Sequence, residues 1–198
     1  MEPPEVTREY EPIQPGTNWR AVFKRLLGPV AVGLGAAAKY GFAFAKFATG
    51  LVALILIHEL GHYLEARRLG LHPNWPIFVP FFGAFVAFKR DSLTPWLLAR
   101  VALAGPYLGA AGAAVFWAVG AAIDSQLLQA LGYFGFLLNL FNLIPIGFLD
   151  GGQTLRSFEY LRRGGGQSKA YIVAALYAGL ALALVAGMIA SHVPQHRL

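Results

Sequence analysis

Long apolar stretches alternate with short polar ones along the chain, and this pattern predicts helices that cross a membrane. A bilayer core of about 30 Å takes about 20 helical residues to cross. Five apolar stretches are near that length or longer, at residues 28–45, 47–69, 96–123, 127–144 and 170–191. Lys39 interrupts the first of them and could extend its amine to the interface. The expected fold is therefore an all-α polytopic membrane protein with about five transmembrane helices.

The segments at the two ends of the chain are polar. Residues 1–27 combine a proline-bearing tail with a short stretch, 19–27, in which Arg and Lys lie among apolar residues. That mixture is typical of a helix at the membrane interface. Residues 193–198 are interpreted as a C-terminal tail. Between them we expect a single membrane-embedded domain over residues 28–192.

The stretch that follows the second apolar segment does not suit a helix. Prolines at positions 73, 76 and 80 prevent a regular helix, and the phenylalanines between Phe78 and Phe88 favour strands. Non-helical backbone survives at membrane depth only inside the protein or beside a wet cavity. We therefore expect a membrane-associated, β-hairpin-like loop that lines a cavity. An interfacial loop anchored by Trp75 is the alternative.

Two other stretches are interpreted as structural. The third apolar segment contains Gly105 and Gly109, a GxxxG pair that lets helices approach closely, and Pro106, which predicts a kink. The segment from Arg156 to Lys169 combines basic residues with consecutive glycines, so we expect a basic, flexible loop there.

The composition agrees with a membrane protein and excludes several kinds of site. Hydrophobic residues make up 57% of the chain and charged residues 13%, against roughly 45–50% and about 25% in soluble domains. The chain has no cysteine, which excludes disulfides, thiolate metal sites and cysteine nucleophiles. The formal charge of +6 is expected to reflect membrane orientation and contact with the lipid bilayer. No nucleic-acid motif is present, so no nucleic-acid partner is expected.

The second apolar stretch carries an HExxH motif, His58-Glu59-Leu60-Gly61-His62. Two histidines four apart lie on one face of a helix and can offer both imidazoles to one metal ion, for which Zn²⁺ is the natural choice. Glu59 lies beside them and can accept a proton from the water that the metal activates. A buried polar cluster without metal is the alternative. A zinc site needs a third ligand from elsewhere.

Asp150 is the best candidate for that third ligand. It follows the fourth apolar stretch, where Pro145 must bend or unwind the helix. Gly151 and Gly152 predict a turn directly after it. Taken alone, Asp150 would more often be an aspartate that caps a helix or a turn at the interface.

The distribution of Lys and Arg predicts the orientation. If all five stretches cross, most of the cations lie on one side, and by the positive-inside rule that side is the cytoplasm. These residues are Arg8, Arg20, Lys24, Arg25, Arg67, Arg68, Lys89, Arg90, Arg100, Arg156, Arg162, Arg163 and Lys169. The HExxH motif and Asp150 both approach that side. We therefore expect a multi-pass protein of the cell membrane with its N-terminus and active site toward the cytoplasm.

The HExxH motif and the later stretch Asn142-x2-Pro145-x4-Asp150-Gly151 together resemble the site-2 protease family of intramembrane zinc metalloproteases. The resemblance covers roughly residues 47–152. It implies that His58, His62 and Asp150 bind one zinc ion per chain and that Glu59 is the catalytic base. It also implies a catalytic role for Asn142, in stabilising the transition state or positioning substrate.

The expected function is hydrolysis of a peptide bond in or near a transmembrane segment of another membrane protein. Such a helix shields its own peptide bonds and must unwind before cleavage. The strand around Phe82, Gly83 and Phe85 could bind the unwound segment by strand addition. A non-catalytic, zinc-containing membrane adaptor is one alternative, and a metal or proton carrier is another. The sequence leaves the substrate and the oligomeric state open.

Overall fold

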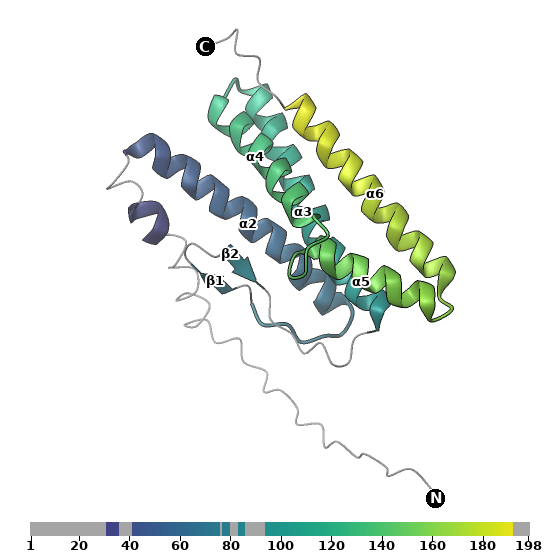
Figure 1. Ribbon diagram of the computed structural model, residues 1–198. Helices are drawn as coiled ribbons and strands as arrows, with labels where there is room; N and C mark the ends of the chain where they lie inside the picture. Colours follow the sequence, from purple (N-terminus) through teal and green to yellow (C-terminus); the bar gives the residue numbers. More distant parts are fainter. Residues whose placement is uncertain (1–30, 36–40, 76, 80–82, 86–93, 192–198) are drawn as a thin grey trace, which may run out of the picture.

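The computed structural model describes residues 31–35, 41–75, 77–79, 83–85 and 94–191 (Figure 1). The polar segment expected at 1–27 and the tail expected at 193–198 lie outside these residues. Within them, three helices are long and apolar enough to cross a membrane. They are α2 (Phe42–Arg68), α3 (Pro95–Ala122) and α6 (Gln167–Ala190). The apolar helix α4 (Gln126–Asn142) is shorter, with 17 residues.

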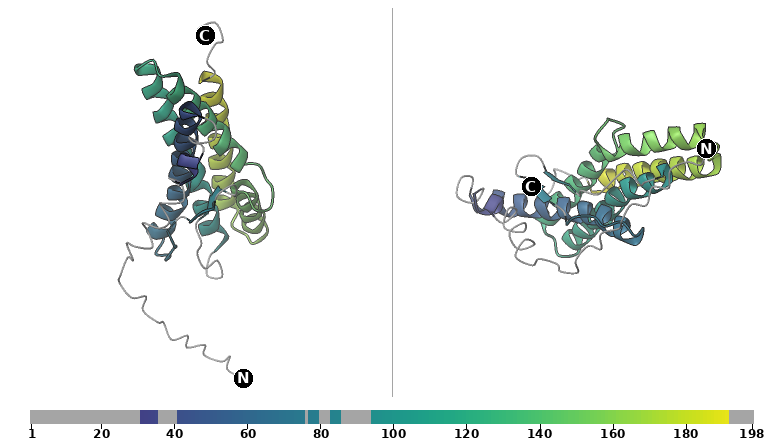
Figure 2. Two further views of the ribbon diagram at one scale, coloured as in Figure 1. Left: turned by 90° about the vertical axis from the view of Figure 1, so that its left-hand side faces the viewer. Right: turned by 90° about the horizontal axis from the view of Figure 1, so that it is seen from below.

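Helices α3 and α4 form an antiparallel hairpin that contacts α2 on one side and α6 on the other (Figures 1 and 2). Capping residues fix where each begins. The Thr94 hydroxyl accepts a hydrogen bond from the Leu97 N–H, and Pro95 occupies the first helical position. The Ser125 hydroxyl accepts from the Leu128 N–H in the same way. Helix α3 ends at Ala122 and α4 begins at Gln126, so the turn between them is tight. The two helices pack against each other.

The segment after Asp150 differs from the expected flexible loop. It forms a helix, α5 (Asp150–Arg163), which ends only where the three glycines begin. Its buried residues recur at helical spacing, with Thr154 and Ser157 following Asp150 on one face and basic side chains on the other. Gly165, with φ of 80°, makes the turn into α6. The three glycines therefore terminate the helix and do not make the whole segment flexible.

The apolar stretch predicted at residues 28–45 does not form one helix up to residue 45. Residues 42–45 belong to α2, because Gly41, with φ of 85°, separates them from what precedes. A helical turn occupies residues 31–35. The intervening residues, with Lys39, lie outside the described part of the chain.

Two short strands follow α2. Strand β1 (Ile77–Val79) pairs antiparallel with β2 (Gly83–Phe85), with Phe78 opposite Ala84. Strand β2 contacts α2, the helix that carries the HExxH motif. The non-helical stretch therefore lies against the helix of the candidate site.

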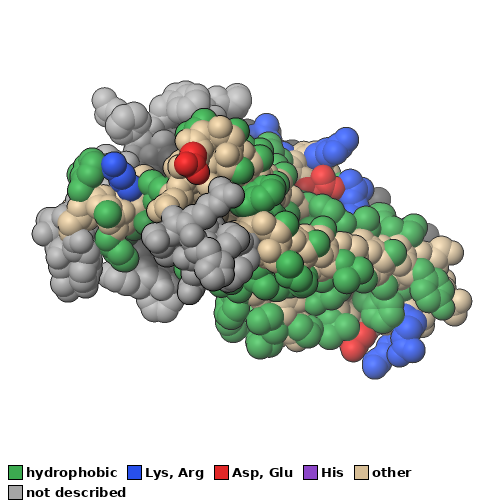
Figure 3. Space-filling model, turned by 90° about the horizontal axis from the view of Figure 1, so that it is seen from above, with side chains coloured by type: hydrophobic (Ala, Val, Ile, Leu, Met, Phe, Trp, Pro, Cys, Tyr) green, Lys and Arg blue, Asp and Glu red, His purple; other side chains and the backbone are tan. Residues whose placement is uncertain are grey.

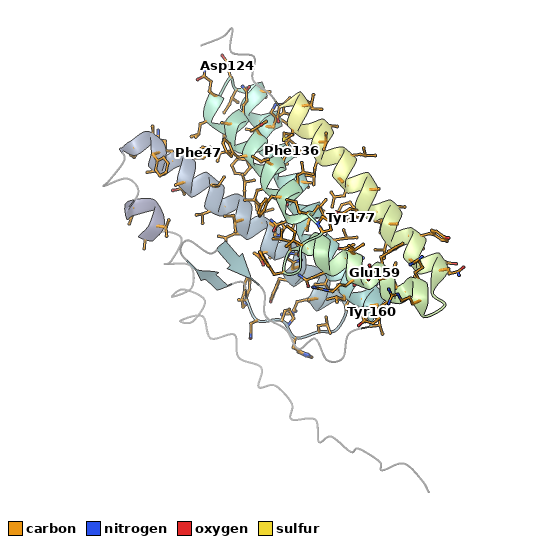
Figure 4. All side chains as sticks on the ribbon, in the orientation of Figure 1. Phe47, Asp124, Phe136, Glu159, Tyr160 and Tyr177 are labelled. Atoms are coloured by element: carbon orange, nitrogen blue, oxygen red, sulfur yellow. The ribbon has the colours of Figure 1, made fainter. Side chains whose placement is uncertain are left out.

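The core lies between α3, α4 and α6, and it consists of apolar side chains. Its buried members are Leu103, Ala113, Phe136, Leu143, Leu180 and Leu184. Phe136 and Tyr177 lie between the helices, whereas Asp124 lies at the far end of the α3–α4 hairpin (Figure 4). Large apolar side chains are also exposed, and they cover most of the described surface seen from that far end (Figure 3). An apolar core with an apolar exterior is the arrangement of an integral membrane protein.

Candidate metal centre

Helix α2 presents the HExxH residues toward the interior of the protein. His58, Glu59 and His62 are all buried, with exposed fractions of 3%, 8% and 8%. One helical turn separates the two histidines, so both rings project from the same face. Their Nε2 atoms lie 3.1 Å apart. The local sequence alone is thus enough to bring two potential ligand atoms together.

Asp150 completes the cluster from the first turn of α5. Its Oδ2 lies 3.1 Å from His58 Nε2 and 3.3 Å from His62 Nε2. The three side chains are buried together, as the sequence predicted for the metal ligands. Burial raises the pKa of the Asp150 carboxyl, and the adjacent His62 and His58 rings lower it by more. The two rings therefore favour the ionised form of this carboxyl.

Gly151 and Gly152 serve a purpose other than the expected turn after Asp150. Both are helical, and the turn precedes them, at residues 143–149. A Cβ on Gly151 would collide with the Leu143 carbonyl oxygen, and one on Gly152 with the Ile146 carbonyl oxygen. The glycines are needed for close approach of α5 to the preceding loop. That approach carries Asp150 to the histidines.

The triangle of three ligand atoms matches one face of a zinc coordination tetrahedron. Bonds of about 2.0–2.1 Å to zinc place tetrahedral ligand atoms about 3.3 Å apart. The edges of this triangle are 3.1, 3.1 and 3.3 Å. Two imidazole nitrogens and one carboxylate oxygen form a common ligand set of catalytic zinc, which keeps a fourth position open. The residues present therefore fit a zinc ion.

Hydrogen bonds to the other ring nitrogens fix the state of both histidines. His62 Nδ1 lies 2.7 Å from the Val101 carbonyl oxygen, which can only accept, so this nitrogen carries the proton. His58 Nδ1 lies 2.8 Å from Asn139 Oδ1. In the neutral rings the lone pair is then on Nε2, so both Nε2 atoms are available to bind one metal ion.

Helix α3 was expected only to pack against other helices, but its glycines also contact the candidate site. A Cβ on Gly105 would collide with His62 Nε2 and Cε1, and would lie 2.8 Å from Cδ2. A Cβ on Gly61 would collide with the Ala104 carbonyl oxygen. The glycines thus permit α2 and α3 to touch where His62 projects. One member of the GxxxG pair makes room for a metal ligand.

Asn142 is not part of the cluster of His58, His62 and Asp150. The Asn142 Nδ2 donates to the Leu138 carbonyl oxygen, 3.1 Å away in its own helix. Gly83 and Phe85 lie in β2, and Phe82 lies outside the described residues. Sequence reasoning missed Asn139, the buried amide that contacts His58. The available signal was a second asparagine within an otherwise apolar helix.

Comparison with known proteins gives concordant matches. The model of "Peptidase family M50" matches residues 46–125 and 121–186. The chain is 34% identical over 165 residues to "Putative zinc metalloprotease Rip3" of Mycobacterium tuberculosis, over 79% of this chain and 41% of that protein. It is 32% identical over 139 residues to "Putative zinc metalloprotease MJ0611" of Methanocaldococcus jannaschii, over 58% of this chain and 73% of that protein. The chain thus spans less than half the length of the mycobacterial relative.

Proposed function

Because the chain belongs to peptidase family M50, we propose that it is an intramembrane zinc metalloprotease that hydrolyses peptide bonds in or near transmembrane segments of other membrane proteins. The observation that carries this proposal is the buried cluster of His58, His62 and Asp150, one part of which lies on a helix apolar enough to cross a bilayer. Ionisable groups in such a helix are costly and mark functional sites.

The proposed reaction requires the cluster residues, Glu59, one zinc ion and one water molecule. His58, His62 and Asp150 would hold one Zn²⁺ per chain. When bound, zinc polarises the scissile carbonyl and lowers the pKa of water. Glu59, the residue next to His58, takes a proton from the attacking water and delivers it to the amide nitrogen as the carbon–nitrogen bond breaks. The products together contain the elements of the peptide and one water molecule, so no other reactant is needed.

The substrate is proposed to bind as an extended segment beside β2. In the described part of the chain, β2 pairs with β1 along one edge only, and it contacts α2. A strand with an unpaired edge can accept another strand through backbone hydrogen bonds. Gly83 would allow close approach, and Phe82 and Phe85 would contact substrate side chains. Replacement Gly83→Pro removes one backbone donor and should raise KM with little change in zinc content.

Asn142 is proposed to position the substrate rather than the metal. Its amide nitrogen is bound to the Leu138 carbonyl oxygen, and the side chain is partly buried. Any contact with substrate requires that hydrogen bond to be exchanged. Replacement Asn142→Ala should therefore lower kcat/KM while zinc per chain stays unchanged. Loss of zinc in this variant would contradict the proposed role.

The active site is proposed to face the cytoplasm. Arg67 and Arg68 end α2, Arg162 and Arg163 end α5, and Lys169 begins α6. These helix ends lie toward the end of the protein opposite Asp124 (Figures 1 and 4). The positive-inside rule assigns that end to the cytoplasm. The chain lacks cysteine, so single cysteines at Arg163 and Asp124 can be labelled in vesicles to test the assignment.

The decisive test of the activity is Glu59→Gln, assayed with a reporter membrane protein in proteoliposomes. The change keeps the shape of the side chain but removes the base, so cleavage should fall by about 10²- to 10⁴-fold while zinc is retained. Glu65→Gln is the matched control, since Glu65 lies on the same helix but pairs with Arg100. Cleavage at the wild-type rate by Glu59→Gln would rule out the mechanism.

Zinc stoichiometry tests the ligands separately. Replacement Asp150→Ala removes one of three protein ligands and should lower the zinc bound per purified chain. Elemental analysis after dialysis against a weak chelator measures this directly. An unchanged zinc content would remove Asp150 from the site.

A further inference from the structure

Asn139 is a completely buried polar side chain in the apolar helix α4. Both ends of its amide are hydrogen-bonded. The Nδ2 donates to the Gly135 carbonyl oxygen at 2.7 Å, and the Oδ1 lies 2.8 Å from His58 Nδ1. A buried amide is costly unless its groups are paired, and here they are. One of its two partners is a candidate metal ligand.

The two hydrogen bonds together determine which atom of the His58 ring faces the metal position. The Gly135 carbonyl can only accept, so it must face the amide nitrogen of Asn139. The amide oxygen is thereby turned toward His58, and it too can only accept. His58 Nδ1 must then carry the proton, and the Nε2 lone pair points to Asp150. The amide thus selects the tautomer that can bind a metal ion.

Gly109 of α3 provides the space in which this amide lies. A Cβ on Gly109 would collide with Asn139 Oδ1 and lie 2.7 Å from both Cγ and Nδ2. The amide cannot move aside without losing a hydrogen bond at one end. Gly112, one turn further along α3, differs in this respect. A Cβ there would lie 3.0 Å from Cγ2 of Ile57, which belongs to a side chain that can shift.

We propose that Asn139 is a positioning residue of the metal centre, which orients His58 and fixes its tautomer, and that Gly109 is required for it. The inference rests on the metal site of the proposed function, although not on proteolysis. Partners of this kind hold metal-binding histidines in place, and their loss typically weakens metal binding 10- to 100-fold. A merely structural amide, which only joins α4 to α2, would affect folding and leave zinc affinity unchanged.

The test measures the zinc dissociation constant of the full chain in detergent, by competition with a chromophoric chelator. Asn139→Leu removes both hydrogen bonds and should weaken zinc binding about 10- to 100-fold. Asn139→Asp keeps an acceptor for His58 Nδ1 but loses the donor to Gly135, so it should bind zinc more tightly than Asn139→Leu does. The visible spectrum of the Co²⁺-loaded protein should change in Asn139→Leu and be retained in Asn139→Asp. Wild-type zinc affinity in a folded Asn139→Leu variant would overturn the proposal.

A second pair of variants decides the matter if Asn139→Leu fails to fold. Gly109→Ala should weaken zinc binding at least about tenfold, whereas Gly112→Ala should change it less than about twofold. Alanine favours a helix more than glycine does, which offsets part of the overpacking at Gly109, so both variants are expected to fold. Equal zinc affinity in these two variants would overturn the inference.

Asp150→Ala distinguishes this failure from failure of the proposed function. If Asp150→Ala loses zinc while Asn139→Leu and Gly109→Ala keep wild-type affinity, the metal site stands and only the positioning role is wrong. If Asp150→Ala itself binds zinc like wild type, the metal site is wrong and the positioning role falls with it.

Discussion

The two ends of the α3–α4 hairpin use glycine for different purposes. One end of the hairpin lies beside His58, His62 and Asp150, and we call it the metal end. There, Gly105 and Gly109 make room for the polar side chains of His62 and Asn139. At the far end, a Cβ on Gly120 would lie 2.6 Å from the backbone nitrogen of Gln129. There, glycine only allows two helices to touch. The same residue type in one helix thus serves a site at one end and helix contact at the other.

This difference predicts that the two ends respond to different changes. The metal end combines buried ionisable groups with a buried amide, which need their partners and, by the proposed function, a zinc ion. The far end is held by close helix contacts and by hydrogen bonds from Gln129 and Ser125 to the Gly120 carbonyl oxygen, and none of these contacts involves an ionisable group. Loss of metal should therefore loosen the metal end alone, and added volume at the far end should lower stability without changing zinc affinity.

The largest expected effect follows from removal of zinc. Zinc that binds only the folded state stabilises it by about 4 kcal/mol when free zinc is 1,000 times the dissociation constant. A strong chelator should remove that contribution and raise amide hydrogen exchange near His58 and Asp150, with little change near Gly132. Hydrogen exchange of the detergent-solubilised protein, read by mass spectrometry, measures both regions in one experiment.

The control for this experiment is Asp150→Ala, in which one ligand is missing. The chelator should then have little further effect on exchange or on thermal stability. Equal loosening of both ends of the wild-type protein would contradict the comparison.

The next effect in size is expected from Gly132→Ala at the far end. The new Cβ would lie 2.5 Å from Trp117 Cβ and 2.8 Å from its backbone nitrogen, so the helices must separate. Overpacking of this kind lowers the free energy of unfolding by about 1–3 kcal/mol. Unfolding in mixed micelles measures this loss, and zinc affinity should stay unchanged.

Gly179→Ala is the matched control. This glycine lies within α6, and a Cβ on it would meet no atom within 4 Å among the described residues. Alanine should therefore leave the free energy of unfolding unchanged or raise it by up to about 1 kcal/mol. A loss as large as that of Gly132→Ala would mean that contact at the far end is not the cause.

The sequence predicted that His58, His62 and Asp150 would form one cluster, and the structure brings these three residues together. His58 and His62 are one turn apart on any helix, and Asp150 is a carboxylate placed after a helix-breaking proline. The hydrophobic pattern likewise located the long helices to within a few residues. The histidine pair and the helices follow from neighbouring residues, whereas Asp150 was chosen because the distant HExxH motif needs a third ligand.

The supporting residues could not be predicted because their roles arise from contacts between distant helices. Nothing in the sequence around Asn139 tells that its amide meets His58, or that Gly109 lies opposite it. The helix α5 was missed for another reason. Its polar face and the glycines that follow resemble a flexible segment unless the spacing of its few buried residues is considered.

A smaller effect is expected at Thr154, one turn beyond Asp150 on α5. Its hydroxyl is buried and has no hydrogen-bond partner among the described residues. Replacement Thr154→Val removes that group and keeps the shape, so the free energy of unfolding should rise by about 1 kcal/mol. Unchanged zinc affinity is the accompanying expectation. A loss of stability would mean that the hydroxyl contributes to the metal end after all.

The smallest effect is expected from the ion pair between Glu65 and Arg100, which joins α2 to α3 near the metal end. The Arg100 Nε donates to Glu65 Oε1 at 2.9 Å, but the Arg100 side chain is 35% exposed. Exposed pairs contribute less than about 1 kcal/mol. A double-mutant cycle with Glu65→Gln and Arg100→Gln should give a coupling energy below that value and no change in zinc affinity. A larger coupling energy would mean that charge, as well as metal and close contact, holds the two helices together at this end.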